Sequence, residues 1–231
     1  MLPRFRRGAF AIFALVFLVT MLLGDRAAVA TATTLDPQAI ASGQRWWTPL
    51  TALVRHGEGV GMWALLLTLT IQWVLGSRLE GFWGATRYLV MVVVAGLVGY
   101  GGVVALGLVS PEIAALEQSG AGPIDAAAAV AFGFVFAREK MRFGSREIPT
   151  IPLAATAATL AIGFPLIAAL AAGTPIAGAW PALIPGLLAG LVATVFVQPW
   201  RKRANSGKVG RSKPSGHPHL RVVRTPEDML N

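Results

Sequence analysis

The sequence of 231 residues contains no cysteine, only two tyrosines and only three histidines, and charged residues make up 13% of it. The absence of cysteine excludes disulfides and thiolate metal sites. Soluble domains contain roughly 25% charged residues, so the low charge content argues against a water-soluble globule. Nothing in the remaining composition implies a metal or a cofactor.

Apolar runs dominate what is present: hydrophobic residues make up 55% of the chain, and the mean hydropathy is +0.62. A transmembrane helix needs roughly 20 mostly apolar residues. Six runs approach this length, at about residues 8–24, 60–77, 88–109, 122–138, 151–172 and 180–198. They are apolar on all sides, as expected of buried or lipid-facing helices. The sequence therefore predicts an all-α polytopic membrane protein with six spans.

The basic residues predict the orientation of these spans. The net charge is +9, and 17 of the 20 lysines and arginines fall in segments that share one side of the membrane. The other side holds only Arg26, Arg45 and Arg55. Because positive residues concentrate on the cytoplasmic side, both chain ends are expected to be cytoplasmic. The distribution favours membrane lipids over nucleic acid as the partner of the positive charge, and it suits a bacterial inner membrane.

The first run has a second interpretation. A basic N-terminal segment precedes a roughly 16-residue apolar run, which is followed by Ala28-Val29-Ala30. This order is also typical of a secretory signal peptide with an A-x-A cleavage site. Cleavage would leave five spans in the same orientation.

The last segment, residues 199–231, is predicted to be a basic cytoplasmic tail. From Arg201 onward the composition changes to Arg, Lys, Ser, Gly, Pro and His. Basic clusters beside a membrane attract anionic lipid by roughly 1 kcal/mol per charge. The tail has too little apolar surface to fold alone, so we expect it to be largely disordered.

The largest segment on the outer side, residues 25–59, ends in an amphipathic stretch that contains Trp46 and Trp47. Tryptophan prefers the membrane–water interface, where its ring is buried and its N–H stays hydrated. The stretch from Gly43 to His56 is therefore predicted to form an interfacial helix that caps the bundle. The two tryptophans are candidates for contact with a substrate or partner.

Several short motifs follow the order found in the rhomboid intramembrane proteases. The A-x-x-x-G-x-x-x-G frame at 182–190 resembles the last core helix of that family. The stretch Arg45–Gly57 resembles its first outer loop, and Gly76–Glu80 resembles the turn after its second helix. The resemblance covers about residues 43–198 and implies a six-transmembrane-helix rhomboid-like bundle.

The same resemblance implies that catalytic residues have been lost. Leu183 occupies the position of the rhomboid catalytic histidine. The oxyanion-stabilising His and Asn of the family would fall near Ala64 and Thr68. In the region of the G-x-S-G motif, either Ser119 is a displaced nucleophile or Gly122 replaces the serine.

Three functions are compatible with this pattern. The stretch at 144–152 resembles the rhomboid-like pseudoproteases of the Golgi, which implies a protein that binds or stabilises transmembrane segments of other membrane proteins without cleaving them. An active intramembrane serine protease would use Ser119 with His56 as its base, because catalytic dyads are recognised by geometry. A structural subunit of a larger membrane complex is the third possibility.

Few polar residues lie within the apolar runs. Asp125 is either a polar site for a substrate helix or a proton, or an acid stabilised in the first turn of a helix by the helix dipole. Gln72 is a candidate for contact with a substrate or partner, or it bridges to a neighbouring helix, which contributes roughly 1 kcal/mol. Gly186 and Gly190 predict close packing of helix backbones.

Overall fold

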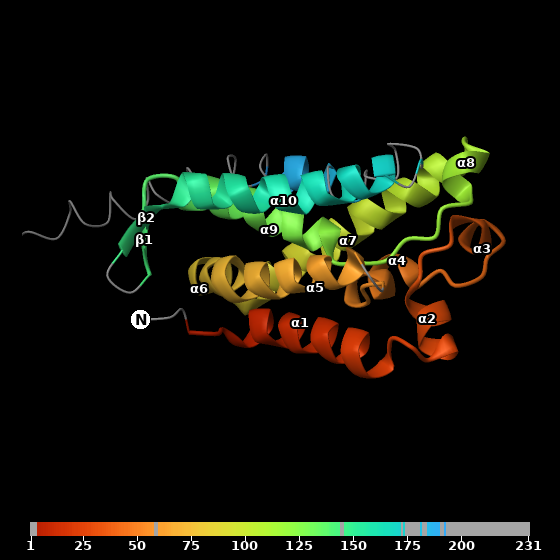
Figure 1. Cartoon of the computed structure of the whole chain (residues 1–231), viewed down its shortest axis with the longest axis horizontal. Helices are drawn as coiled ribbons and strands as arrows, with labels where there is room; N and C mark the ends of the chain where they lie inside the picture. Colours follow the sequence, from red (N-terminus) through yellow and green to blue (C-terminus); the bar gives the residue numbers. More distant parts are fainter. Residues whose placement is uncertain are drawn as a thin grey trace, which may run out of the picture. The chain divides into compact units, whose positions relative to one another are not determined.

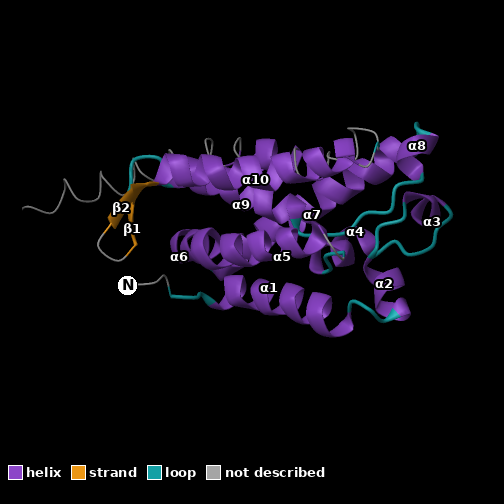
Figure 2. Cartoon of the chain, in the orientation of Figure 1, coloured by secondary structure: helices purple, strands orange, loops and turns teal. Residues whose placement is uncertain are grey.

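The computed structural model describes residues 4–57, 60–143, 146–171, 173, 181, 184–189 and 192. Helices dominate the described chain (Figure 2), as the sequence predicts. The α-helices are α1 (Arg7–Leu18), α2 (Ala27–Thr33), α3 (Pro37–Ala41), α4 (Thr48–Thr51), α5 (Val60–Ile71), α6 (Ser77–Trp83), α7 (Ala85–Gly107), α8 (Pro111–Ala114), α9 (Gly122–Val135) and α10 (Thr150–Ala171). Two π-helical segments, η1 (Val19–Leu23) and η3 (Gln72–Gly76), and a 3-10 turn, η2 (Ala52–Val54), complete the helical elements.

Three helical stretches are long and apolar enough to cross a membrane. They are Gly61–Trp83, Ala85–Gly107 and Thr150–Ile167. Arg7–Leu23 and Gly122–Val135 are shorter apolar helices. The prediction of a helical protein able to span a membrane is therefore confirmed. Leu183, Gly190 and most of the predicted sixth run lie outside the described residues.

Large apolar side chains are exposed along the outer faces of these helices. They include Phe10, Phe17 and Leu22 on α1 and η1, Val90, Val94 and Leu97 on α7, and Ile151, Leu160 and Ile167 on α10. Contiguous apolar surface of this kind is rare on soluble monomers. It is expected where a helix faces lipid.

The alanine-rich helix α9 forms the centre of the described bundle. It packs against α10, α7 and α5, and it lies beside α10 in Figure 1. The run Ala126–Ala129 is at most 1% exposed. Small side chains let neighbouring helices approach closely when the solvent is lipid. Gly186 lies beside this run, because a Cβ atom added there would be 3.5 Å from that of Ala126, an ordinary packing distance.

The second apolar run continues further than the sequence predicts. The helix does not end near residue 77 but passes through the π-helical segment η3 into α6 and ends at Trp83. The stretch Gly76–Glu80, expected to be a turn, is therefore helical. Glu80 tolerates burial there because its carboxylate accepts hydrogen bonds from the backbone N–H groups of Gly8, at 3.0 Å, and Ala9, at 2.8 Å. These N–H groups open α1 and have no partner within their own helix.

The described chain also contains a β-hairpin, which the all-α prediction missed. Strands β1 (Lys140–Phe143) and β2 (Arg146–Pro149) pair antiparallel, with Met141 opposite Ile148. Thr150 ties the hairpin to α10, because its hydroxyl donates to the Glu139 carbonyl at 2.8 Å. The paired strands are four residues each, at the lower limit of the length over which alternation predicts a strand.

Connecting segments predicted to share a side of the membrane lie together. The hairpin and the start of α1 are at one end of the bundle, and α2, α3 and α8 are at the other (Figure 1). At the first end, the Arg6 N–H donates to the Ser77 hydroxyl at 3.5 Å. At the second end, Leu35 and Gln118 form an isolated antiparallel bridge. The described connecting segments thus gather at two ends of the bundle.

Two glycines of α7 give a matched test of this packing. A Cβ atom at Gly99 would lie 2.7 Å from the Pro181 carbonyl oxygen and 2.9 Å from the Pro123 ring, whereas Gly101 has no neighbour within 4 Å. We expect Gly99→Ala to lower the free energy of unfolding by about 1–3 kcal/mol through overpacking. Gly101→Ala should be neutral or stabilising, since alanine favours helix by up to about 1 kcal/mol. Thermal unfolding in detergent, followed by tryptophan fluorescence, measures both. Equal stability of the two variants would contradict the packing.

Candidate functional site: a buried polar cluster

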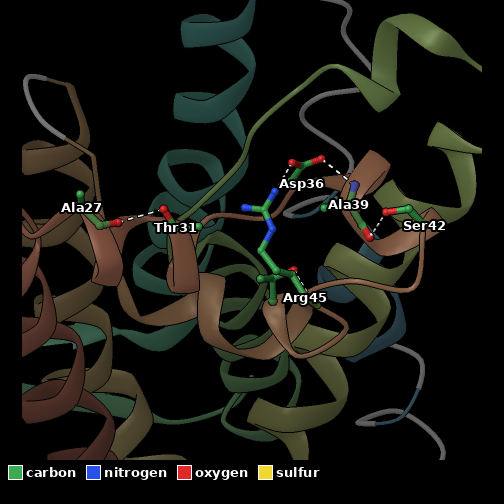
Figure 3. A network of polar contacts seen from close by, with 7 residues as sticks. Ala27, Thr31, Asp36, Ala39, Ser42 and Arg45 are labelled. Carbon is green, nitrogen blue, oxygen red and sulfur yellow. Dashed lines mark hydrogen bonds and ion pairs between the residues drawn. The ribbon is translucent and has the colours of Figure 1, made fainter.

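The outer segment before the second span is held by its own polar contacts (Figure 3). Asp36 caps α3 by accepting from the Ala39 N–H at 3.0 Å, and its other carboxylate oxygen pairs with the Arg45 guanidinium. Arg45 has a φ of 50°, a left-handed conformation that is uncommon outside glycine. The ion pair with Asp36 and the bond from the Thr48 hydroxyl to the Arg45 carbonyl, at 2.9 Å, hold this turn.

The predicted interfacial helix over Gly43–His56 is wrong in its extent. Only α4 and the 3-10 turn η2 are helical there, because the left-handed Arg45 interrupts the stretch before α4 begins at Thr48. Trp46 is 75% exposed and Trp47 is 41% exposed, and their rings meet edge to face at 6.0 Å. Both tryptophans are therefore accessible for contact at the outer end, as their candidate role requires.

Leu53 anchors η2 against α7. A Cβ atom at Gly96 would lie 2.3 Å from Leu53 Cδ1, so only glycine leaves room for this side chain. The Ala52 carbonyl accepts from the Gly120 N–H at 2.8 Å, and the Tyr100 hydroxyl donates to the Gly120 carbonyl at 2.6 Å. These contacts hold η2 near the start of α9, so that His56, which follows η2 in the chain, lies there as well.

A cluster of five polar side chains lies where this outer segment meets the helices. We call it the polar cluster; its members are His56, Thr68, Gln72, Tyr88 and Asp125. Each member is at most 6% exposed. Buried polar groups are costly unless they are hydrogen-bonded, and every member here has a partner within the cluster.

Asp125 is the centre of the polar cluster. Its Oδ2 accepts from the Thr68 hydroxyl at 2.5 Å, and its Oδ1 accepts from the Gln72 amide at 3.2 Å. None of the ion pairs between described residues involves Asp125. Hydrogen-bond donors on α5 and η3 therefore solvate this carboxyl group, which links the second span to α9.

Tyr88 extends the polar cluster to α7. Its hydroxyl donates to Gln72 Oε1. A Cβ atom at Gly76 would lie 2.6 Å from the Tyr88 hydroxyl, so glycine at this position leaves space for the bond. Gly76 and Tyr88 thus pack directly against each other.

His56 joins the outer segment to the polar cluster. Its Nε2 lies 3.2 Å from the Thr68 hydroxyl and 3.4 Å from the Ala121 N–H. Its backbone N–H donates to the Thr20 hydroxyl at 3.1 Å. Burial lowers the pKa of His56 from 6.5 to about 4, so the imidazole is neutral at physiological pH.

The proton positions of Asp125, Thr68 and His56 are interdependent. The Thr68 hydroxyl has one proton, and it donates that proton to Asp125. Its contact with His56 then requires a proton on Nε2, whereas the Ala121 N–H requires Nε2 to accept. One neutral tautomer cannot satisfy both contacts. The shorter contact, to Thr68, favours the Nε2–H tautomer.

Ser119 is not hydrogen-bonded to His56 in the part of the chain that the structure describes. Gly120, with a φ of 125°, lies against the imidazole instead, and a Cβ atom there would be 3.4 Å from Nδ1. The hydroxyl next to the His56 ring belongs to Thr68, which is 0% exposed. The geometry therefore joins His56 to a hydroxyl that a substrate cannot reach.

A small cavity of about 170 Å³ reaches His56 from the outer end. It is lined by Thr20, Met21, Gly24, Asp25, Arg55, His56, Gly57 and Met62. Neither Ser119 nor Thr68 lines it. Within the described ranges, no group of three His, Asp or Glu side chains is placed to hold a metal ion.

Sequence reasoning identified part of this site. Gln72 and Asp125 are brought together, and Thr68 lies between Asp125 and His56. Tyr88 was not identified as a site residue. Tyr88 could have been found from the sequence, because tyrosine is rare in this chain and lies here at the start of an apolar run. A buried tyrosine hydroxyl usually needs a hydrogen-bond partner.

The lowered pKa of His56 predicts a pH dependence of stability. In the unfolded chain His56 takes up a proton near pH 6.5, but in the folded chain only near pH 4. The unfolded state therefore binds more protons between these values, and stability falls as the pH drops from 6.5 to 4. The loss attributable to His56 is on the order of 3 kcal/mol.

Denaturant unfolding at pH 7.5 and pH 4.5 measures this loss. The variant His56→Gln should be less stable than the wild type at pH 7.5 and show a smaller decrease on acidification. An identical pH dependence in both proteins would contradict the burial of a neutral imidazole.

Comparison with known proteins gives no family for the chain. No protein-family model matches it, and no curated protein is significantly similar to it in sequence.

Proposed function

We propose that this protein is a rhomboid-like pseudoprotease that binds or stabilises transmembrane segments of other membrane proteins without cleaving them. The observation that carries the proposal is the engagement of the His56 imidazole. Among the described residues, the side-chain hydroxyl within hydrogen-bond distance of this ring is that of Thr68, which is fully buried and also bonded to Asp125. A serine nucleophile needs a base that can take its proton, and Ser119 has no hydrogen bond to His56.

The helix α10 offers a surface for a partner helix. Ala155 and Thr159 are exposed on it, and Gly163 has no described atom within 4 Å of an added Cβ. These three residues are spaced by four, so they lie along one helix face. Small residues spaced by four are a common contact face between membrane helices. The exposed tryptophans at the outer end would contact the same partner where it leaves the membrane.

The proposal also includes the orientation of the protein and the membrane in which it lies. The end that holds the hairpin and the start of α1 would be cytoplasmic, because the predicted inner segments carry most of the lysines and arginines. The protein would cross a bacterial inner membrane six times, with the run at 180–198 as its sixth span. The contact of Gly186 with α9 supports a helix in that position.

A photo-crosslinking amino acid at Thr159 tests the partner surface in cells, with Leu97 on the exposed face of α7 as the control position. We expect discrete adducts with full-length membrane proteins at position 159 and none at position 97. Labelling of the purified protein with a fluorophosphonate probe tests the absence of protease chemistry, and we expect none.

Three results would contradict the proposal. Probe labelling that is lost in both Ser119→Ala and His56→Ala would favour an active intramembrane serine protease. Truncated partner fragments that disappear in Ser119→Ala would have the same meaning. Adducts of constant stoichiometry with one fixed set of proteins would favour a structural subunit instead.

The absence of cysteine allows a direct topology test. Single cysteines are introduced by Gln44→Cys in the outer segment and by Lys140→Cys in the hairpin. In spheroplasts of a bacterial host, a membrane-impermeant maleimide should label the Gln44→Cys protein. It should label the Lys140→Cys protein only after the membrane is permeabilised. The reverse pattern would contradict the proposed orientation.

A further inference from the structure

A second pocket lies at the end of the bundle that holds the hairpin and the start of α1. Its volume is about 370 Å³, and it is lined by Arg4, Arg6, Ser77, Arg78, Gly81, Phe82, Phe136 and Glu139. Three separate parts of the chain build it: the segment before α1, the helix α6, and the link between α9 and the hairpin. The proposed function makes no use of it.

The residues that line the pocket carry more positive than negative charge. Three of its lining residues are arginines, and Glu139 is the only acid among them. Neither of the ion pairs between described residues involves these arginines or Glu139. The nearby carboxylate of Glu80 is already engaged by two backbone N–H groups of α1. The pocket therefore presents an excess of unpaired positive charge.

Arg78 carries the strongest sign of a missing ligand. Its Nη1 atom is buried and has no hydrogen-bond partner in the described chain. The guanidinium is fixed by the Phe136 ring, whose centroid is 5.8 Å from Cζ. A buried donor without an acceptor costs about 1–3 kcal/mol, and more when it is charged. An anion in the pocket would supply the acceptor.

Arg6 is positioned at the same pocket. Its guanidinium lies against the backbone of α6, where a Cβ atom added at Gly81 would be 3.5 Å from Nε. The backbone N–H of Arg6 donates to the Ser77 hydroxyl, which holds the segment before α1 beside α6. The Arg6 and Arg78 guanidinium groups thus approach the pocket from two different elements.

We propose that this pocket binds a phosphate group, as carried by the headgroup of an anionic phospholipid or by a soluble phosphate compound. Arginine is suited to this task because its planar fork of donors matches phosphate oxygens in pairs. The exposed Phe82 ring at the same pocket gives it an apolar edge, as a lipid headgroup site requires. The positive end of the bundle is where anionic headgroups would be met.

The test uses the full-length protein, delipidated in a non-ionic detergent. Native mass spectrometry counts phosphatidylglycerol and phosphatidylcholine molecules that stay bound, and tryptophan fluorescence follows thermal unfolding as each lipid or inorganic phosphate is added. We expect one tightly bound phosphatidylglycerol per chain and an increase in Tm. Phosphatidylcholine, whose headgroup has no net charge, should bind at least about tenfold more weakly.

Variants assign the binding to the pocket. Arg78→Gln should weaken phosphatidylglycerol binding about tenfold or more, which corresponds to a lost charged hydrogen bond. Arg78→Lys should weaken it as well, because a lysine keeps the charge but not the fork. Arg6→Gln gives an independent test at an exposed residue, should Arg78→Gln fail to fold. Arg142→Gln, on β1 and outside the pocket, makes the same change in net charge and should have no effect.

The outcomes separate the two phosphate sources and decide the proposal. Stabilisation by phosphatidylglycerol alone identifies a lipid headgroup site, whereas equal stabilisation by millimolar inorganic phosphate identifies a site for a soluble phosphate compound. Either kind of stabilisation should depend on Arg78, and either would support a phosphate site in this pocket. Equal effects of Arg142→Gln and Arg78→Gln, or equal binding of both lipids, would overturn it. Neither result depends on whether the protein binds a partner helix or cleaves it.

Discussion

The fold depends on the need to hydrogen-bond one carboxyl group inside an apolar helix. Asp125 lies in the first turn of α9 and is 3% exposed, where an unpartnered acid would be costly. Its two oxygens take their donors from Thr68 and Gln72, on the helix that forms the second span. Those two residues in turn bind His56 from the outer segment and Tyr88 from α7. One buried acid therefore fixes the relative positions of three helices and the outer segment.

The sequence predicted the apolar helices well, because composition alone determines which runs can lie in lipid. It predicted less where a residue's environment depends on a distant partner. Glu80 looked like part of a turn, yet it is buried in α6 because the N-terminus of α1 supplies two donors. His56 was expected in the outer segment, yet it is buried in the polar cluster, where Leu53 packs in the space left by Gly96. The hairpin was missed because each of its strands has only four residues.

Several residues of the candidate site were predicted from the sequence, but the hydrogen bonds between them were not. Asp125 was expected either as a functional polar site or as a structural acid, and its bonds to Thr68 and Gln72 favour the structural role. The same bonds explain why a histidine can lie near the start of α9 without a serine nucleophile: its neighbouring hydroxyl is already committed to Asp125. At the other end, the arginine-lined pocket is open and unpaired. The polar cluster is thus satisfied by internal hydrogen bonds, whereas the arginine-lined pocket is suited to an external anion.

The central claim is that Asp125 and Thr68 act as one structural unit. A double-mutant cycle with Thr68→Val and Asp125→Asn, measured as free energies of unfolding in detergent, tests it most directly. The account predicts that each single variant is destabilised and that the double variant loses less than the sum, with a coupling energy of about 1–3 kcal/mol. Additive losses, with a coupling below about 0.5 kcal/mol, would contradict the claim.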